Sequence, residues 1–318
     1  MKSPQHILFS IAVPAYKETF LQECIDSVLS QSYPYFELII VNDASPFDLD
    51  SIIDKYEDSR IRYYKNYENC GAINVVDNWN RCLEYAKGDY FICIGDDDRL
   101  LTNCLDEYVD LINRYPGLGV YHMLTELIDE ESQLYNMQQS RPEYETAYSL
   151  AWHRWNGRDK QFIGDFCYDV SLLRISGGFY KLPLAWGTDV ISAIRASKKT
   201  GVANSQVIGF QYRVNSQSIT KSGEVHNKLN AINKSKTWFE EFLKEEPTND
   251  LDRKYAILLR RNLQQYIKRE LVYAISRDIV SGRIIVKVFT WLKSYRKYNL
   301  SLKEFLYSCL LAIKDKNK

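Results

Sequence analysis

Residues 90–98 read Tyr90-Phe91-Ile92-Cys93-Ile94-Gly95-Asp96-Asp97-Asp98, an apolar run that ends in three adjacent carboxylates. The apolar part predicts a buried β-strand. Neighbouring carboxylates repel one another unless a cation or strong donors hold them, and oxygen ligands suit Mg2+ or Mn2+. Asp also favours turns and helix N-caps, and a helix is predicted to begin near Leu101. Taken alone, the run fits a turn or cap as well as it fits a metal site.

Strand and helix patterns alternate around this run through residue 114. Apolar runs predict strands over residues 7–13, 36–41, 61–64 and 90–94. One-sided apolar spacing predicts helices over residues 21–29, 72–86 and 101–114. The alternation predicts an α/β fold with a Rossmann-like, mostly parallel sheet flanked by helices. In open sheets of this kind ligands bind at the carboxyl ends of the strands, which is where the three carboxylates are expected.

The second half of the chain is less regular. A strand pattern covers 118–127, a short helix is predicted over 189–198 and another strand over 207–214. Beyond about residue 225 the pattern is helical, with turn-forming residues at 247–250. We therefore predict a division into residues 1–224 and a helical region, 225–318.

Charge is unevenly spread along the chain, although the formal net charge is zero. Residues 251–318 carry 16 Lys and Arg against 5 Asp and Glu, a net +11, which leaves −11 on residues 1–250. This asymmetry predicts an acidic body with a basic tail for an anionic membrane surface. Alternatively, the apolar stripes of the tail pack on the rest of the chain or on a second subunit, and its basic residues are solvated. No nucleic-acid partner is expected, because no recognised nucleic-acid motif accompanies the charge.

Cysteine and histidine spacing gives no metal or disulfide signature. The seven cysteines include no C-x-x-C pair, which is typical of reduced thiols in a cytosolic protein. Residues 1–6 lead straight into a predicted strand, so no secretory signal is expected. No apolar run approaches the roughly 20 residues of a membrane-spanning helix. We expect a cytoplasmic protein, either free or peripheral on the inner face of the cell membrane.

Acidic residues follow three predicted elements. Asp43 follows the second strand, Asp97 and Asp98 follow the fourth, and Asp189 begins a later helix. Alone, Asp43 fits an Asx-turn and Asp189 fits a helix cap. A fold that brings all of them to one sheet edge would instead assemble a base-recognising carboxylate, a metal site and a catalytic base.

Several ordered motifs resemble those of family-2 inverting glycosyltransferases with the GT-A fold. The opening motifs are Ser10-Ile11-Ala12-Val13-Pro14-Ala15-Tyr16-Lys17 and Phe36-Glu37-Leu38-Ile39-Ile40-Val41-Asn42-Asp43-Ala44-Ser45. The later ones are Asn78-Trp79-Asn80-Arg81-Cys82, Ala86-Lys87-Gly88-Asp89-Tyr90 with the acidic run, Ser176-Gly177-Gly178-Phe179, Trp186-Gly187-Thr188-Asp189 and Tyr212-Arg213-Val214-Asn215. The resemblance covers residues 7–220, roughly two thirds of the chain. It implies a GT-A catalytic domain over residues 1–224.

The resemblance implies a site for a nucleotide-sugar donor, most often a UDP-sugar. Pro14, Ala15 and Tyr16 would line the nucleotide pocket, with Tyr16 beside the base. Asp43 would accept a hydrogen bond from an N–H of uracil or another base. Asp97 would face the ribose and the sugar.

The resemblance also implies the chemistry. Asp98, the last carboxylate of the D-x-D motif, would coordinate Mn2+ or Mg2+ at the diphosphate, and Arg213 would hold the diphosphate or a closing loop. Asp189 would be the general base that takes a proton from the acceptor hydroxyl. A metal stabilises the charge on a departing nucleoside diphosphate, and a carboxylate that activates a hydroxyl on the opposite face leads to inversion.

The chain departs from the family pattern at three positions. Gly95 stands where many members have the first Asp of the acidic motif, and Thr188 stands where many have Glu. Asn215 stands where a His often follows the Tyr-Arg pair, which weakens any prediction of a His metal ligand. None of these changes removes an essential group.

Tryptophans supply candidates for the acceptor site. Trp152, Trp155 and Trp186 could stack against sugar faces. A buried structural pair is the alternative for Trp152 and Trp155.

We predict an enzyme that transfers one sugar from a nucleotide donor to a hydroxyl of a glycan or lipid-linked acceptor in surface polysaccharide synthesis. One alternative is an inactive scaffold of the same fold that binds sugar nucleotides or glycans. A second is a sugar-1-phosphate nucleotidyltransferase. That class should carry a Gly-rich basic loop after the first strand, where this chain has Pro14-Ala15-Tyr16-Lys17-Glu18.

Overall fold

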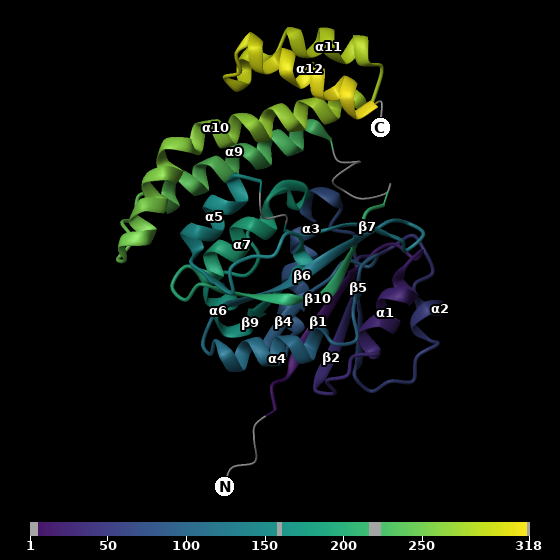
Figure 1. Cartoon of the computed structure of the whole chain (residues 1–318). Coiled ribbons are helices and arrows are strands. Elements are labelled where there is room, and N and C mark those ends of the chain that lie inside the picture. The colour runs from purple at the N-terminus through teal and green to yellow at the C-terminus, as the bar shows by residue number, and fades with distance from the viewer. Residues whose placement is uncertain (1–5, 158–160, 216–223, 317–318) are drawn as a thin grey trace. The chain divides into compact units, whose positions relative to one another are not determined.

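A computed structural model of the chain describes residues 6–157, 161–215 and 224–316 (Figure 1). The chain divides into two compact units. Unit 1 comprises Met1–Lys181 and Thr188–Ser216, and unit 2 comprises Leu182–Gly187 and Gln217–Lys318. The short segment Leu182–Gly187 therefore groups with the helical region, although the predicted domain 1–224 includes it. The predicted boundary at 224 adjoins residues 216–223, which lie outside the described part of the chain.

Unit 1 is built on a ten-stranded sheet. Its strands are β1 Phe9–Ala15, β2 Phe36–Asn42, β3 Ile61–Lys65, β4 Tyr90–Cys93, β5 Arg99–Leu100, β6 Val120–Ile128, β7 Leu134–Met137, β8 Tyr144–Glu145, β9 Phe166–Asp169 and β10 Val202–Arg213. They follow the order β3-β2-β1-β4-β9-β6-β10-β5, with β7 beside β6 and β8 beside β10. The predicted strand over 207–214 is therefore the second half of a longer one.

Strand direction changes across the sheet. β3, β2, β1 and β4 are parallel, as the alternation of strands and helices predicts. β9 then pairs antiparallel with both β4 and β6, while β6 and β10 are parallel again. The α/β prediction is confirmed, and the parallel half is the part that the sequence pattern described.

Helices flank the sheet of unit 1 (Figure 1). They are α1 Leu21–Leu29, α2 Asp50–Ile53, α3 Val75–Tyr85, α4 Cys104–Arg114, α5 Ala147–Trp155, α6 Val170–Ile175 and α7 Thr188–Ser197. Alternate residues of β1, such as Ile11 and Val13, share a buried core with the apolar faces of α1 and α4. The predicted helix over 72–86 begins with a 3-10 turn, Ala72–Asn74, before α3. Alternation along the strands thus gives each face of the sheet an apolar surface for helices to cover.

One motif of α3 is tied to the segment after α6. Asn80 Nδ2 donates to the Phe179 carbonyl at 3.1 Å, and the Phe179 N–H donates to Asn80 Oδ1 at 2.8 Å. Gly178 has a φ of +71°, and a Cβ there would lie 2.4 Å from Asn80 Oδ1. Glycine is needed at this position for both conformation and space.

Unit 2 consists of helices: α9 Val225–Phe242, α10 Asp250–Val280, α11 Ile284–Leu292 and α12 Leu302–Lys316, with the 3-10 turns Pro183–Ala185 and Tyr295–Tyr298. The turn signal at 247–250 separates α9 from α10, and Asn249 Oδ1 caps α10 by accepting from the Asp252 N–H at 2.8 Å. Leu259, Leu263 and Ile267 form part of the buried stripe of α10. Within the described residues, no helix has the length and apolar character needed to cross a membrane.

Candidate active site

The carboxyl ends of β1, β2 and β4 meet at one edge of the sheet. Ala15 pairs with Asn42 at the ends of β1 and β2, and β4 runs parallel to β1 on its other side. The Asp43 N–H donates to the Ala15 carbonyl at 2.9 Å. The structure therefore brings Asp43 and the acidic turn, Gly95–Asp98, to the same edge.

Asp43 is held by the loop that follows β3. Its Oδ1 accepts from Asn66 Nδ2 at 2.6 Å and from the Cys70 N–H at 3.0 Å. Its Oδ2 accepts a longer bond from that N–H, at 3.2 Å. Asn66 is itself fixed by a bond to Asn78 Oδ1 at 2.9 Å. The carboxylate is thus oriented by the loop after β3.

Pro14, Ala15 and Tyr16 lie at this edge, where β1 ends. Ala15 is buried, whereas Tyr16 is 41 % exposed, so its ring is open to a ligand. The Tyr16 carbonyl accepts from Ser45 Oγ at 2.6 Å, which ties the residue to the loop after β2. The Tyr16 backbone and the loop that follows Asp43 are thus joined at this edge, and a base pocket beside the Tyr16 ring stays a prediction.

Asp96 joins the acidic turn to the segment after β1. Asp96 Oδ2 accepts from the Tyr16 N–H at 2.8 Å and from the Lys17 N–H at 2.7 Å. The side chain is nearly buried, and burial raises the pKa of Asp96 above its usual value, opposed chiefly by the charge of Lys17. The two backbone donors fix the turn relative to residues 16 and 17.

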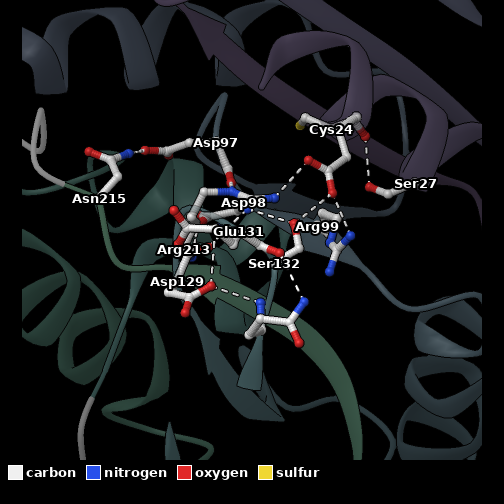
Figure 2. Close-up of polar contacts among 12 residues, drawn as sticks. Cys24, Ser27, Asp97, Asp98, Arg99, Asp129, Glu131, Ser132, Arg213 and Asn215 are labelled. Atoms are coloured by element: carbon white, nitrogen blue, oxygen red, sulfur yellow. Dashed lines mark hydrogen bonds and ion pairs between the residues drawn. The ribbon is translucent and has the colours of Figure 1, made fainter. Parts of the chain in front are cut away.

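Asp97 is more accessible than Asp98, with a side chain that is 14 % exposed. Lys17 Nζ lies 2.6 Å from Asp97 Oδ2. Asn215 Nδ2 donates to the same oxygen, and Figure 2 shows the two side chains pointing toward one another. A lysine and an amide therefore flank this carboxylate.

Asp98 lies deeper, with 2 % of its surface exposed. Its Oδ1 accepts from the Arg213 N–H at 2.9 Å, and its Oδ2 accepts from the Gly95 N–H at 3.2 Å. Burial, followed by the charge of Asp97, raises the pKa of Asp98 well above its usual range. A carboxylate in this position costs free energy when charged, unless a cation compensates it.

The Arg213 side chain contacts the backbone of the acidic turn (Figure 2). Its Nε donates to the Asp97 carbonyl at 2.8 Å, and one terminal nitrogen donates to the Asp129 carbonyl at 3.0 Å and to Ser132 Oγ at 2.8 Å. The other terminal nitrogen pairs with Glu23 Oε2 at 2.8 Å. All three nitrogens bind protein acceptors, so Arg213 supports the turn in this structure. Its contact with a diphosphate stays a prediction.

Asp189 lies in the first turn of α7 and is partly buried. Burial raises the pKa of Asp189 to about 6, with Arg154 opposing the shift and Asp165 adding to it. Tyr212 links it to the acidic turn: burial and then the charges of Asp98, Asp97 and Asp189 all raise the pKa of this phenol. The charges of Asp189 and of the acidic turn therefore all act on this tyrosine.

The three candidate acceptor tryptophans are not equivalent. Trp155 is 2 % exposed, whereas Trp152 on the same helix is half-buried. Trp186 belongs to unit 2, where its ring lies 6.4 Å from that of Tyr273 and Lys228 Nζ lies over it at 5.2 Å. Of the pair on α5, only Trp152 is open to a ligand.

The residues fit a divalent cation that also binds the substrate. No group of three or more His, Cys, Asp or Glu side chains with metal-site geometry occurs within the described ranges. Mg2+ is commonly bound through one or two carboxylates and substrate phosphates rather than by an all-protein cage. Asp97 and Asp98 supply that number of carboxylates.

Three residues of the site escaped sequence reasoning. Lys17 follows β1, Glu23 lies in the first turn of α1, and Asn66 follows β3. Their partners, Asp97, Arg213 and Asp43, lie 80, 190 and 23 residues away in the sequence. Only the position of Asn66 directly after a strand carried a local signal.

A family model described as Glycosyl transferase family 2 matches residues 10–178. The chain is 32% identical over 127 residues to an uncharacterized glycosyltransferase of Rickettsia typhi, covering 39% of this chain and 38% of that protein. It is 32% identical over 108 residues to TuaG of Bacillus subtilis, provisionally named a teichuronic acid biosynthesis glycosyltransferase, covering 33% and 42%. It is 29% identical over 129 residues to the GalNAc(5)-diNAcBac-PP-undecaprenol beta-1,3-glucosyltransferase of Campylobacter jejuni, covering 39% and 40%. The chain thus spans about two fifths of the length of these relatives.

Solved structures share the fold at low identity. TarS 1-349 of S. aureus, in complex with UDP-GlcNAc, superposes with a TM-score of 0.57 at 16% identity, covering 92% of both chains. The mannosyltransferase PcManGT of Pyrobaculum calidifontis, in complex with GDP-Man and Mn2+, gives 0.58 at 16% identity, covering 98% of this chain and 89% of that one. These neighbours identify the fold of the chain as GT-A.

Proposed function

The chain belongs to glycosyl transferase family 2. We propose that it transfers one sugar from a nucleotide-sugar donor to a hydroxyl of a glycan or lipid-linked acceptor, with inversion. The proposal is supported by Asp43 and the acidic turn at one carboxyl edge of the parallel strands, with Asp98 held by the Arg213 N–H, and by the partly buried Asp189, whose charge also acts on Tyr212. Transfer needs charge compensation at the diphosphate and a base at the acceptor hydroxyl, and these groups can supply both.

The donor would bind with its base between Tyr16 and Asp43. Asp43 Oδ2 would accept the base N–H, because Oδ1 already accepts two shorter bonds. We favour a UDP-sugar, since TarS is described in complex with UDP-GlcNAc and with UDP. Asp97, the more exposed carboxylate, would face the ribose and sugar.

Asp98, with Asp97 beside it, would hold Mn2+ or Mg2+. Bound there, the metal would supply positive charge to the departing diphosphate. Backbone donors from Arg213 and Gly95 orient the Asp98 carboxylate, and the buried Arg213 network keeps those donors in place. Because the Asp98 carboxylate is already oriented, the metal site would not need to rearrange when charge develops on the diphosphate.

Asp189 would be the general base. A pKa of about 6 keeps it charged near neutral pH while making it more basic than an ordinary Asp. It would take the proton of the acceptor hydroxyl as that oxygen attacks the anomeric carbon on the face opposite the diphosphate. The attack on that face is what inverts the configuration.

Two alternatives have less support. An inactive scaffold need not retain both the acidic turn and Asp189, yet this chain keeps them. A sugar-1-phosphate nucleotidyltransferase should carry a Gly-rich basic loop after β1, where this chain has 14–18 without glycine. The names of TuaG and of the Campylobacter glucosyltransferase favour surface polysaccharide or lipid-linked glycan synthesis.

We also propose that unit 2 binds an anionic membrane surface through one face of α11 and α12. The exposed apolar residues of this α11–α12 face are Ile285, Val286, Phe289 and Leu292 on α11, and Leu302, Leu306, Tyr307, Leu310 and Ile313 on α12. Exposed basic residues accompany them at Arg283, Lys293, Arg296, Lys297, Lys303 and Lys314. An apolar stripe with basic flanks is the composition of interfacial helices on anionic lipid.

The opposite sides of these helices are already packed within unit 2. Trp291 Nε1 donates to Asp278 Oδ2 at 2.8 Å, and the rings of Tyr295 and Phe305 stack at 5.0 Å. Glu304, the one acidic residue between 281 and 314, pairs with Lys268 at 3.0 Å. The α11–α12 face is therefore cationic and apolar, which suits anionic lipid better than a second copy of the same face.

A donor screen tests the transferase proposal. Purified protein is heated with UDP-, GDP- and dTDP-sugars, with and without Mn2+, and hydrolysis or transfer of the sugar is followed in parallel. A ligand at a hundredfold excess over Kd should stabilise the fold by about 2.7 kcal/mol. We expect a metal-dependent shift with UDP-sugars and release of UDP. A shift without turnover for any acceptor glycan would favour the scaffold, and no shift with any donor would contradict the donor site.

A further inference from the structure

Lys17 occupies the position of a counter-ion in the acidic turn. Its Nζ lies 2.6 Å from Asp97 Oδ2 and 3.3 Å from Asp96 Oδ1, and the side chain is 23 % exposed. In the described part of the chain it is the only side-chain cation paired with a carboxylate of the turn. The Arg213 guanidinium binds the Asp97 carbonyl, and its carboxylate partner, Glu23, lies outside the turn. One ammonium group therefore compensates a turn that carries three acidic side chains.

Lysine is suited to a cation position that another cation replaces on ligand binding. Its ammonium is a single charge on a flexible four-carbon stem, so it can move several ångströms without moving the backbone. The backbone at this point is fixed independently, because the Lys17 and Tyr16 N–H groups both bind Asp96. The side chain can leave Asp97 while the loop keeps its place.

We propose that the Lys17 ammonium holds the cation position at Asp97 in the ligand-free protein and yields it to the divalent metal that binds with the donor. This inference rests on the proposed function, because it requires a metal and a diphosphate at the turn. A divalent cation alone meets the repulsion of the ammonium. When the nucleotide arrives, its diphosphate attracts both cations, and Lys17 moves from Asp97 to a phosphate oxygen. The two ligands should therefore bind with positive coupling.

A structural ion pair is the alternative. In that case Lys17 only stabilises the turn, and its removal would weaken the fold without strengthening metal binding. The two interpretations differ in the sign of one quantity: the affinity for metal in the absence of nucleotide.

Mn2+ binding, followed by the loss of the free-ion EPR signal on titration, measures this quantity without catalysis. The proteins are the full-length wild type, Lys17→Met, Lys17→Arg and the control Lys55→Met, each with and without UDP. Lys55 is an exposed lysine of unit 1 that contacts Gln22 instead of the acidic turn. Circular dichroism and thermal unfolding in EDTA check that each variant is folded.

We expect Lys17→Met to bind Mn2+ alone on the order of tenfold more tightly than the wild type, since it lacks a like charge close to the metal. UDP should strengthen Mn2+ binding less in Lys17→Met than in the wild type. Lys17→Arg and Lys55→Met should bind Mn2+ alone no more tightly than the wild type. In EDTA, Lys17→Met should unfold at a lower temperature, and Mn2+ should restore it.

Equal or weaker Mn2+ binding by Lys17→Met would overturn the inference and leave the proposed function intact, provided that the wild type binds Mn2+ with UDP. If no variant binds Mn2+ even with UDP, the inference and the metal-assisted part of the proposed function both fail. Sugar transfer measured in EDTA then tells whether the transferase proposal survives.

Discussion

The backbone N–H of Arg213 donates to Asp98 Oδ1 at 2.9 Å, across a separation of 115 residues. This bond joins the end of β10 to the acidic turn after β4, and the Arg213 side chain reinforces it through the Asp97 carbonyl at 2.8 Å (Figure 2). The position of the carboxylates at the sheet edge is therefore fixed by β10, which lies more than a hundred residues later in the sequence.

Arg213→Met should destabilise the protein strongly. The side chain is fully buried and donates to Glu23, Asp129, Ser132 and the turn, so its loss leaves buried acceptors unpaired. Breaking such a buried, charged network costs about 3–5 kcal/mol. Urea unfolding measures the change, and Arg114→Met, at a half-exposed arginine, should stay within about 0.5 kcal/mol of the wild type. An equal, small effect in both variants would show that the network contributes little.

Asp189→Asn should lower turnover strongly while leaving donor binding nearly normal. Loss of a general base lowers turnover by about 10²–10⁴-fold. The variant should also unfold at a higher temperature at pH 8, because burial opposes the charged form of Asp189 and the amide carries no charge. Steady-state kinetics, donor titration and thermal unfolding check the three points. Unchanged turnover would exclude Asp189 as the base.

The pH profile should carry the signature of the same group. The pKa of Asp189 is raised to about 6, so kcat/KM should fall as pH drops below 6 and the base becomes protonated. For stability the sign is opposite. A raised pKa in the folded state gives stability that is fully present below the unfolded pKa near 3.8 and is lost as pH rises through 6. Comparing the free energy of unfolding of Asp189→Asn with that of the wild type from about pH 3.5 to about pH 7 covers this window, and parallel curves would contradict the assignment.

Asp98→Ala should remove metal-dependent donor binding and also weaken the fold. Two backbone N–H groups, from Gly95 and Arg213, lose their acceptor, which costs about 1–3 kcal/mol. UDP binding is measured by calorimetry with Mn2+ and with EDTA, and stability by urea unfolding. The exposed Asp54→Ala serves as the control. Mn2+-dependent binding that survives in Asp98→Ala would move the metal role to Asp97.

The double substitution Ile285→Glu, Phe289→Glu should release the protein from anionic vesicles. Both side chains are exposed on the α11–α12 face, so their replacement should not disturb packing, but it places carboxylates against an anionic surface. Co-sedimentation with phosphatidylglycerol and with phosphatidylcholine vesicles measures binding, which should need the anionic lipid and weaken with salt. Leu134→Glu, at another exposed apolar residue, is the control. A wild-type dimer that dissociates in the double variant, without vesicle binding, would point to a second copy instead.

Local sequence patterns predicted most strands and helices of this protein up to residue 114. The apolar runs of β1, β2 and β4 and the one-sided helices between them were predictable, because strand and helix periodicity is written in neighbouring residues. The placement of Asp43 and of the acidic turn at one sheet edge followed from parallel pairing alone. The family resemblance then supplied roles that no periodicity could give.

The tertiary structure decided which side chains meet. Strand order and loop closure over many residues decide three features of the site. Lys17 pairs with Asp97, the buried Arg213 binds the backbone of the turn, and Trp155 is closed to ligands. The antiparallel insertion of β9 between β4 and β6 is equally non-local. Short-range propensity sets what each segment becomes, whereas burial and hydrogen bonding between distant segments set what each residue can do.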